Sequence, residues 1–212
     1  MLSTIERASY DARFATLFAI DPRTIIKMSD RHAATIDKVG VGGVIRIGGE
    51  TFVVQKIAKY VETNEEGTKD LDYNVTELVL LSLKTGETRY IEWSVDDEIE
   101  ISFTERKLSA PELARELRGL DGDTVDIDEE IDDIDGFRFN GRDYAYDDDY
   151  PCRYSASDGR SGKATMYEFG SDEVGWLTIE AWKNGDEWEY EGYLSRALPA
   201  RSIEVISIGA KS

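Results

Sequence analysis

The stretch Ile45–Val54 (IRIGGETFVV) decides the fold, because a second version of it follows at Phe137–Tyr146 (FRFNGRDYAY). Both versions place an arginine between two large apolar residues, turn at a glycine and then resume their alternation. Alternation of this kind is typical of a half-buried strand, and Gly-Gly or Asn-Gly between two such runs indicates a tight β-hairpin. A hairpin pattern that occurs twice predicts a duplicated β unit.

The duplication divides the chain into four segments. We expect an N-terminal helical segment at 1–39, a first β unit at 40–108, a helix with an acidic linker at 109–135, and a second β unit at 136–212. Each β unit holds several short strands separated by turn residues, which is typical of small barrels and bent sheets. The predicted fold is therefore mainly β (β-rich α+β): tandem duplicated small β-barrels or bent antiparallel sheets, with an N-terminal helix and a helix between the units.

Capping patterns locate the two helices. Ser3–Glu6 (STIE) is a capping box before apolar residues at helical spacing, so the first helix should span about 4–19. Ser109–Glu112 (SAPE) is a second capping box, with a proline in the first turn. Residues 22–38 fit either a short strand or a helical turn, and both remain open. Residues 121–135 contain nine acids in fifteen positions, and like charges favour an extended linker.

Net charge restricts the partners. The 212 residues carry a formal charge of −19, which repels phosphate backbones and anionic membranes, so we expect neither nucleic acid binding nor membrane insertion. Cationic partners are the electrostatic complement, although a merely soluble surface explains the charge equally well. The single cysteine, Cys152, and an N-terminus without an apolar signal core predict a cytoplasmic protein.

The residue types that carry most catalysis and metal binding are scarce. The only histidine, His32, is remote in sequence from Cys152, so a nucleophilic relay is not expected and the thiol is interpreted as structural. The acidic run from Asp121 lacks the glycine that a calcium loop needs at its sixth position, where Asp126 stands. We therefore predict no catalytic residues, no cofactor and no metal, and the chain is not expected to be an enzyme.

Two carboxylates and four tryptophans are the candidates for a binding site. Glu92 and Glu180 occupy corresponding strands of the two units, and either acid could bind a cation or simply pair with an arginine. Aromatic faces attract cations, so tryptophans beside these acids could line a groove, although a packed barrel core is the commoner use. The complete candidate ligand-binding set is Glu92, Trp93, Trp176, Glu180, Trp182 and Trp188.

The second unit also carries a distinctive order of aromatic strands. A Tyr-Glu-Phe strand precedes Gly175–Glu180 (GWLTIE) and then Asn184–Trp188 (NGDEW). In this order of motifs, residues 136–206 resemble domain-of-unknown-function family 4178. Residues 40–108 keep an aromatic residue and a glutamate in Arg89–Trp93 (RYIEW) but lack the Trp-Leu pair, so they resemble it as a diverged copy. The resemblance implies a small β-rich accessory protein of the cytoplasm, often in tandem and encoded near polyamine-metabolism or envelope-stress genes, with no catalytic residues to transfer.

Several functions fit these patterns. The first prediction is a non-catalytic interaction or scaffold module that binds a protein partner or itself through exposed sheet edges or through the groove between the units. The alternative is a regulatory binding protein for a cationic small molecule such as a polyamine, which requires an inward-facing acid beside a tryptophan in a real pocket. An enzyme that uses those acids and an acidic mimic of nucleic acid are the weaker alternatives. The pocket discriminates between the first two predictions.

Overall fold

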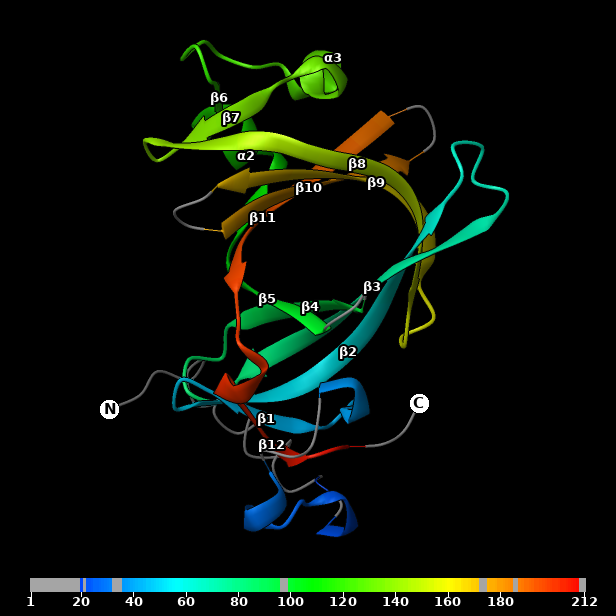
Figure 1. The fold of residues 1–212 in the computed structure, drawn as a ribbon, viewed down its shortest axis with the longest axis vertical. Coiled ribbons are helices and arrows are strands. Elements are labelled where there is room, and N and C mark those ends of the chain that lie inside the picture. Colours follow the sequence, from blue (N-terminus) through cyan, green and yellow to red (C-terminus); the bar gives the residue numbers. More distant parts are fainter. Residues whose placement is uncertain are drawn as a thin grey trace, which may run out of the picture.

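The chain closes into one antiparallel barrel with extra strands on its outside (Figure 1). The computed structural model describes residues 20, 22–31, 36–95, 99–171, 175–184 and 187–209. The helix predicted at 4–19 and the residue His32 lie outside these described residues. The mainly-β class and the barrel predicted from the sequence are confirmed.

Each half of the chain supplies five strands in the same order, one short strand followed by four that enter the barrel. The first half contains β1 (Val44–Ile47), β2 (Glu50–Thr63), β3 (Asp70–Ser82), β4 (Thr88–Val95) and β5 (Ile99–Ser109). The second half contains β7 (Gly136–Phe139), β8 (Arg142–Ala156), β9 (Ser161–Ser171), β10 (Gly175–Asn184) and β11 (Glu187–Ala197).

The two halves share the barrel, which corrects the expectation of a separate barrel or sheet in each unit. Strand β5 pairs with β11, where Leu108 lies opposite Gly192. Strand β2 pairs with β8, where Tyr60 lies opposite Tyr154. Each four-stranded half would present two unpaired edges alone, and the edges of one half satisfy those of the other. Closure therefore depends on both halves.

The two hairpins that were recognised in the sequence occupy corresponding places in the topology. β1 joins β2 through Gly48–Gly49, and β7 joins β8 through Asn140–Gly141. The turn residues have φ of 55° and 83° in the first hairpin and 50° and 74° in the second. Positive φ at both central positions defines the type I′ turn, which glycine and asparagine adopt most readily. Both short strands then pass along the outside of the barrel.

The segment between the halves is folded rather than an extended linker. Helix α2 begins after Ser109, whose backbone N–H and hydroxyl both donate to the Glu112 carboxylate at 2.9 and 2.7 Å. Three apolar residues of the acidic run, Val125, Ile127 and Ile131, are buried in the core, which opposes extension by like charges. The elements here are α2 (Ala110–Glu116), β6 (Arg118–Gly119), α3 (Ile127–Glu130) and the 3-10 turn η4 (Ile131–Asp133).

The remaining elements cover the other end of the sheet. Within 22–31 and 36–38, the described parts of this segment, the chain forms short 3-10 turns and one bridge from Ile25 to Ser207, so these parts are neither a regular strand nor an α-helix. Strand β12 pairs with β1. The elements are η1 (Pro22–Thr24), η2 (Met28–Asp30), η3 (Ile36–Lys38), η5 (Ala200–Ser202) and β12 (Ile203–Ser207).

Apolar cores lie on the outer faces of the barrel wall. One core packs Phe137 and Phe139 of β7 and Leu113 of α2 against residues of β9, β10 and β11 such as Phe169. The other packs β1 and β12 against β2, β3 and β4, with Phe52 and Leu80 at its centre. The flanking strands therefore serve as covers that let the outward side chains of the barrel be buried.

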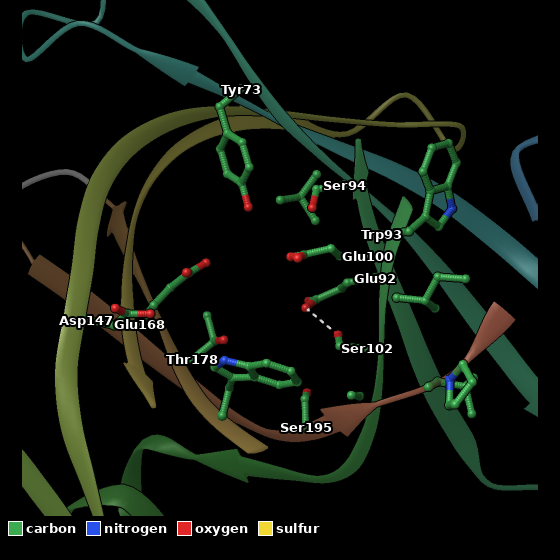
Figure 2. A pocket seen from close by; sticks show the side chains of 16 residues that line it. Tyr73, Glu92, Trp93, Ser94, Glu100, Ser102, Asp147, Glu168, Thr178 and Ser195 are labelled. Carbon is green, nitrogen blue, oxygen red and sulfur yellow. Dashed lines mark hydrogen bonds between the residues drawn. The ribbon is translucent and has the colours of Figure 1, made fainter. Parts of the chain in front are cut away.

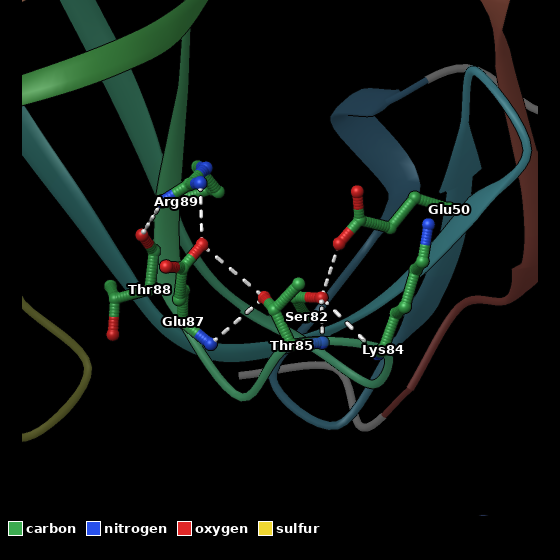
Figure 3. Close-up of polar contacts among 7 residues, drawn as sticks. All are labelled: Glu50, Ser82, Lys84, Thr85, Glu87, Thr88 and Arg89. Atoms are coloured by element: carbon green, nitrogen blue, oxygen red, sulfur yellow. Dashed lines mark hydrogen bonds and ion pairs between the residues drawn. The ribbon is translucent and has the colours of Figure 1, made fainter.

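The turn from β3 to β4 is held by side-chain hydrogen bonds (Figure 3). The hydroxyl of Ser82 accepts from the backbone N–H groups of Lys84 and Thr85 at 3.2 and 3.0 Å and donates to the carboxylate of Glu50. The Arg89 guanidinium donates to Glu87 at 2.6 Å. This network fixes the turn between β3 and β4.

In the part of the chain that the structure describes, no helix has the length and apolar character needed to cross a bilayer.

Candidate functional site

The inside of the barrel is polar and aromatic, unlike its outside. Inward-facing residues at one end form a small cluster of tyrosines with Cys152, Ala164 and Met166. Towards the other end, acids and hydroxyls replace them. Small barrels are ordinarily filled by apolar side chains, so a polar interior indicates a binding site rather than a packed core.

A cavity of about 420 Å³ opens at this acidic end. The carboxylates of Glu92, Glu100 and Glu168 face it from β4, β5 and β9, and Tyr73 of β3 points into it (Figure 2). Trp176 of β10 also lines the cavity and is 38% exposed. Acids and aromatic faces from several strands therefore surround one space, a combination that suits a cation.

Glu92 lies on the inner wall of the cavity. Its Oε2 accepts a hydrogen bond from Ser102 at 3.4 Å, while its buried Oε1 has no partner among the described residues. Burial raises the pKa of Glu92 to about 8, and the nearby charges of Glu77 and Glu168 act in the same direction. A carboxyl group with such a pKa is largely protonated at neutral pH.

Glu180 lies further along the interior face of β10, two residues beyond the cavity-lining Thr178. It is 1% exposed, and its Oε2 accepts from the indole N–H of Trp182 at 3.0 Å. Its Oε1 has no partner within the described chain. Burial raises the pKa of Glu180 well above its ordinary value, with further contributions from Glu77 and Glu92.

A third interior acid, Glu77, stands opposite Glu92 in the pairing of β3 with β4. It is 2% exposed, and burial raises its pKa to about 7, although the charges of Lys56 and Lys107 oppose that shift. Lys107 forms an ion pair with Glu191 at 2.7 Å, and Lys56 donates to the Tyr154 hydroxyl at 2.8 Å. Both lysine charges act on Glu77, and neither is among the charges that shift the pKa of Glu92.

The structure divides the predicted site residues into three groups. Glu92 and Trp176 line the cavity together, and Glu180 and Trp182 form a hydrogen-bonded pair deeper inside. Trp93 also borders the cavity, but its indole extends away from the carboxylates and packs against the outer core, because adjacent residues of a strand face opposite sides (Figure 2). Trp188 is 43% exposed, and its ring lies 5.6 Å from the Lys183 ammonium, so it does not join the interior site.

Sequence reasoning missed several of the interior acids. Glu77 begins an almost continuous apolar run, which is typical of a strand covered on both faces. The run therefore gave no sign that the Glu77 side chain faces a polar interior. Asp147 begins an acidic triplet that reads in the sequence as solvated surface charge, yet it lines the cavity with Glu168. The alternation along β10 carried a usable signal, because Trp176, Thr178, Glu180 and Trp182 share one side while Leu177 and Ile179 share the other.

Neither the cysteine thiol nor the metal-binding residue types form a second candidate site in the part of the chain that the structure describes. The Cys152 thiol is free and buried, and burial raises its pKa to about 12, so it is not activated as a nucleophile. In the described ranges, no group of three or more histidine, cysteine, aspartate or glutamate side chains is arranged to hold a metal ion.

Fold and cavity define a class: a closed antiparallel barrel with covered outer faces and an acid-lined interior. The family model named Domain of unknown function (DUF4178) matches residues 40–199, and the chain therefore belongs to that family. The match spans both halves, so the family domain is the shared barrel and not only residues 136–206. Neither the curated proteins nor the solved structures include a significant match to this chain.

Proposed function

We propose that this chain is a non-catalytic regulatory protein of the cytoplasm that binds an organic cation, such as a polyamine, in the barrel cavity. The observation that carries the proposal is the juxtaposition of Glu92 and Trp176 in one open cavity, with a buried carboxylate oxygen left without a partner. Of the two functions predicted from the sequence, the binding protein is the one that requires this arrangement.

The neighbouring residues support a cation rather than an anion. Glu100, Glu168 and Asp147 add negative charge around the same space. An ammonium group donates hydrogen bonds to carboxylates and is attracted to aromatic faces, and both contacts strengthen where water is excluded. The interaction module remains a prediction, and it would use surfaces outside the barrel, since every barrel strand already pairs on both sides.

We also infer that the two halves arose by duplication. The support is the common strand order, the type I′ turn in each short-strand hairpin, and the reciprocal pairing of β2 with β8 and of β5 with β11. Reciprocal antiparallel junctions are what an approximate two-fold relation between two halves produces. Superposition of β1–β5 on β7–β11 in an experimental structure tests this inference.

Calorimetric titration with 1,4-diaminobutane in physiological salt tests the binding function. We expect saturable binding that Glu92→Gln weakens by about tenfold or more, because a charge-assisted contact contributes roughly 1.5–3 kcal/mol. Glu65→Gln is the matched control, since it makes the same substitution at an exposed loop residue that does not line the cavity.

Three outcomes would contradict this function. Heat that disappears in moderate salt would indicate only diffuse attraction to an acidic surface. Equal affinity for wild type and Glu92→Gln would place binding outside the cavity. Binding of Ca²⁺ in preference to the diamine would identify a metal site instead.

A further inference from the structure

Three carboxyl groups share the closed interior of the barrel with little compensating charge. Glu77 and Glu180 are almost completely buried, and the Oε1 atom of Glu92 is buried as well. Glu77 and Glu92 are directly opposite on neighbouring strands, which brings their side chains within about 5 Å at Cβ. Ionised carboxylates at such separations repel, and burial penalises their charge further.

The two interior lysines are engaged with other groups. The Lys107 ammonium pairs with Glu191 and lies over the rings of Tyr90 and Tyr193 at 5.7 and 5.1 Å. Lys56 donates to a tyrosine hydroxyl and lies over the same ring at 5.5 Å. Their positive charges act on Glu77, whereas the charges that act on Glu92 are the negative charges of Glu77 and Glu168.

The other titratable groups around Glu92 do not supply a positive charge. Glu100 of β5, Asp147 of β8 and Glu168 of β9 are acidic and line the same cavity. Tyr150 of β8 is neutral, since burial raises its pKa, and its hydroxyl donates to Glu168 at 3.0 Å. Glu180 of β10 adds to the acidic set, and Ser102 offers Glu92 its hydrogen bond.

We propose that cation binding in the barrel cavity releases a proton from the interior carboxyl cluster, and that Glu92 is the group that gives it up. This inference rests on the proposed function. An incoming ammonium group brings the positive charge that Glu92 lacks and donates to its unpartnered oxygen. The proton leaves for solvent as the carboxylate forms, so one positive charge enters the cavity as another departs.

The direction in which cation affinity changes with pH follows from the protonation state of Glu92 in the ligand-free protein. Because the pKa of Glu92 is about 8 without a ligand, the group is protonated at pH 7 and ionises only when the cation lowers its pKa. Affinity should therefore rise with pH up to about 8, by as much as about tenfold for each pH unit when one proton is released. Above that pH Glu92 is already ionised, and the affinity should level off.

Titration calorimetry of 1,4-diaminobutane at pH 7.0, in phosphate and in Tris, counts the released protons. The heats of protonation of these buffers differ, so the difference in observed enthalpy gives the proton number. The ligand keeps its own protons at this pH, because the pKa of an alkylammonium group is about 10.4. We expect about one proton for wild type and for Glu65→Gln, and a value near zero for Glu92→Gln.

A pH series on the wild-type protein between pH 6 and 9 provides a second measurement that needs no variant. Saturable binding with equal heats in both buffers and an affinity independent of pH would overturn the coupling and leave the binding function intact. Proton release that persists in Glu92→Gln would overturn the assignment to Glu92. Absence of saturable binding at every pH would overturn the binding function together with the coupling.

Discussion

The outward face of β10 carries Leu177 and Ile179, whereas its inward face carries Thr178 and Glu180. All four residues are buried, with exposures between 0 and 7%, so burial alone does not distinguish the two faces. The outward residues pack in an apolar core beneath β7 and α2, while the inward residues face acids and hydroxyls. From this difference we expect the covered outside of the barrel to contribute most of the stability, so that polar groups are tolerated on the inside.

Substitution of an outward residue should have the largest effect. Ile179→Ala removes a side chain with no exposed surface and should lower the free energy of unfolding by about 2–5 kcal/mol, because lost burial and a residual cavity both contribute. Urea denaturation followed by circular dichroism measures the loss. A change below about 1 kcal/mol would place the stabilising core elsewhere.

Substitution of an inward acid should have the opposite sign and depend on pH. A raised pKa means that the folded state keeps a proton that the unfolded state has lost, so the contribution of Glu180 is present below the ordinary carboxyl pKa and is lost as pH rises towards its folded pKa. Relative to wild type, Glu180→Gln should therefore gain stability with pH, by up to about 1.4 kcal/mol for each pH unit.

Denaturation curves for both proteins at about pH 5.5 and pH 7.5 test that gain. Glu65→Gln is the control, because it makes the same substitution at an exposed loop residue. If the free energy of unfolding changes with pH by the same amount in Glu180→Gln as in wild type, Glu180 is ionised in the folded protein.

Replacing a turn glycine should destabilise the protein equally in the β1–β2 hairpin and in the β7–β8 hairpin. Gly49→Ala and Gly141→Ala each put a side chain on a residue with φ of 83° or 74°, and an added Cβ would meet no atom within 4 Å in either turn. The cost is therefore backbone strain alone, about 1–2 kcal/mol in each variant. Thermal unfolding of the two variants compares them, and a clearly unequal loss would contradict the equivalence of the hairpins.

Loss of an exposed ion pair should have the smallest effect. The Nε of Arg138 lies 2.6 Å from Asp143 across the β7–β8 hairpin, but both side chains are about half exposed, at 42% and 56%. Water and salt screen such pairs, and many contribute nothing measurable. Arg138→Ala should leave the midpoint of urea denaturation unchanged, whereas a large shift would assign this arginine a structural role.

The local features of the fold were accessible from the sequence because each depends on a few neighbouring residues. Alternation and the turns at Gly48–Gly49 and Asn140–Gly141 determined the hairpins, and the Ser109–Glu112 capping box lies at the start of α2. The site was accessible only in part. Glu92, Trp93 and Trp176 all border the cavity, although strand alternation turns the indole of Trp93 towards the outer core.

The sequence by itself determined the strands, their tight turns and the charge of the surface, since period-two alternation and glycine conformations act over short distances. Tertiary structure decided that the two halves complete one barrel, because the partner of a strand edge lies about a hundred residues away. It also decided which side of each strand is the inside. Both faces of β10 are buried, so only the packing of β7 and α2 against one of them turns Glu180 towards the interior.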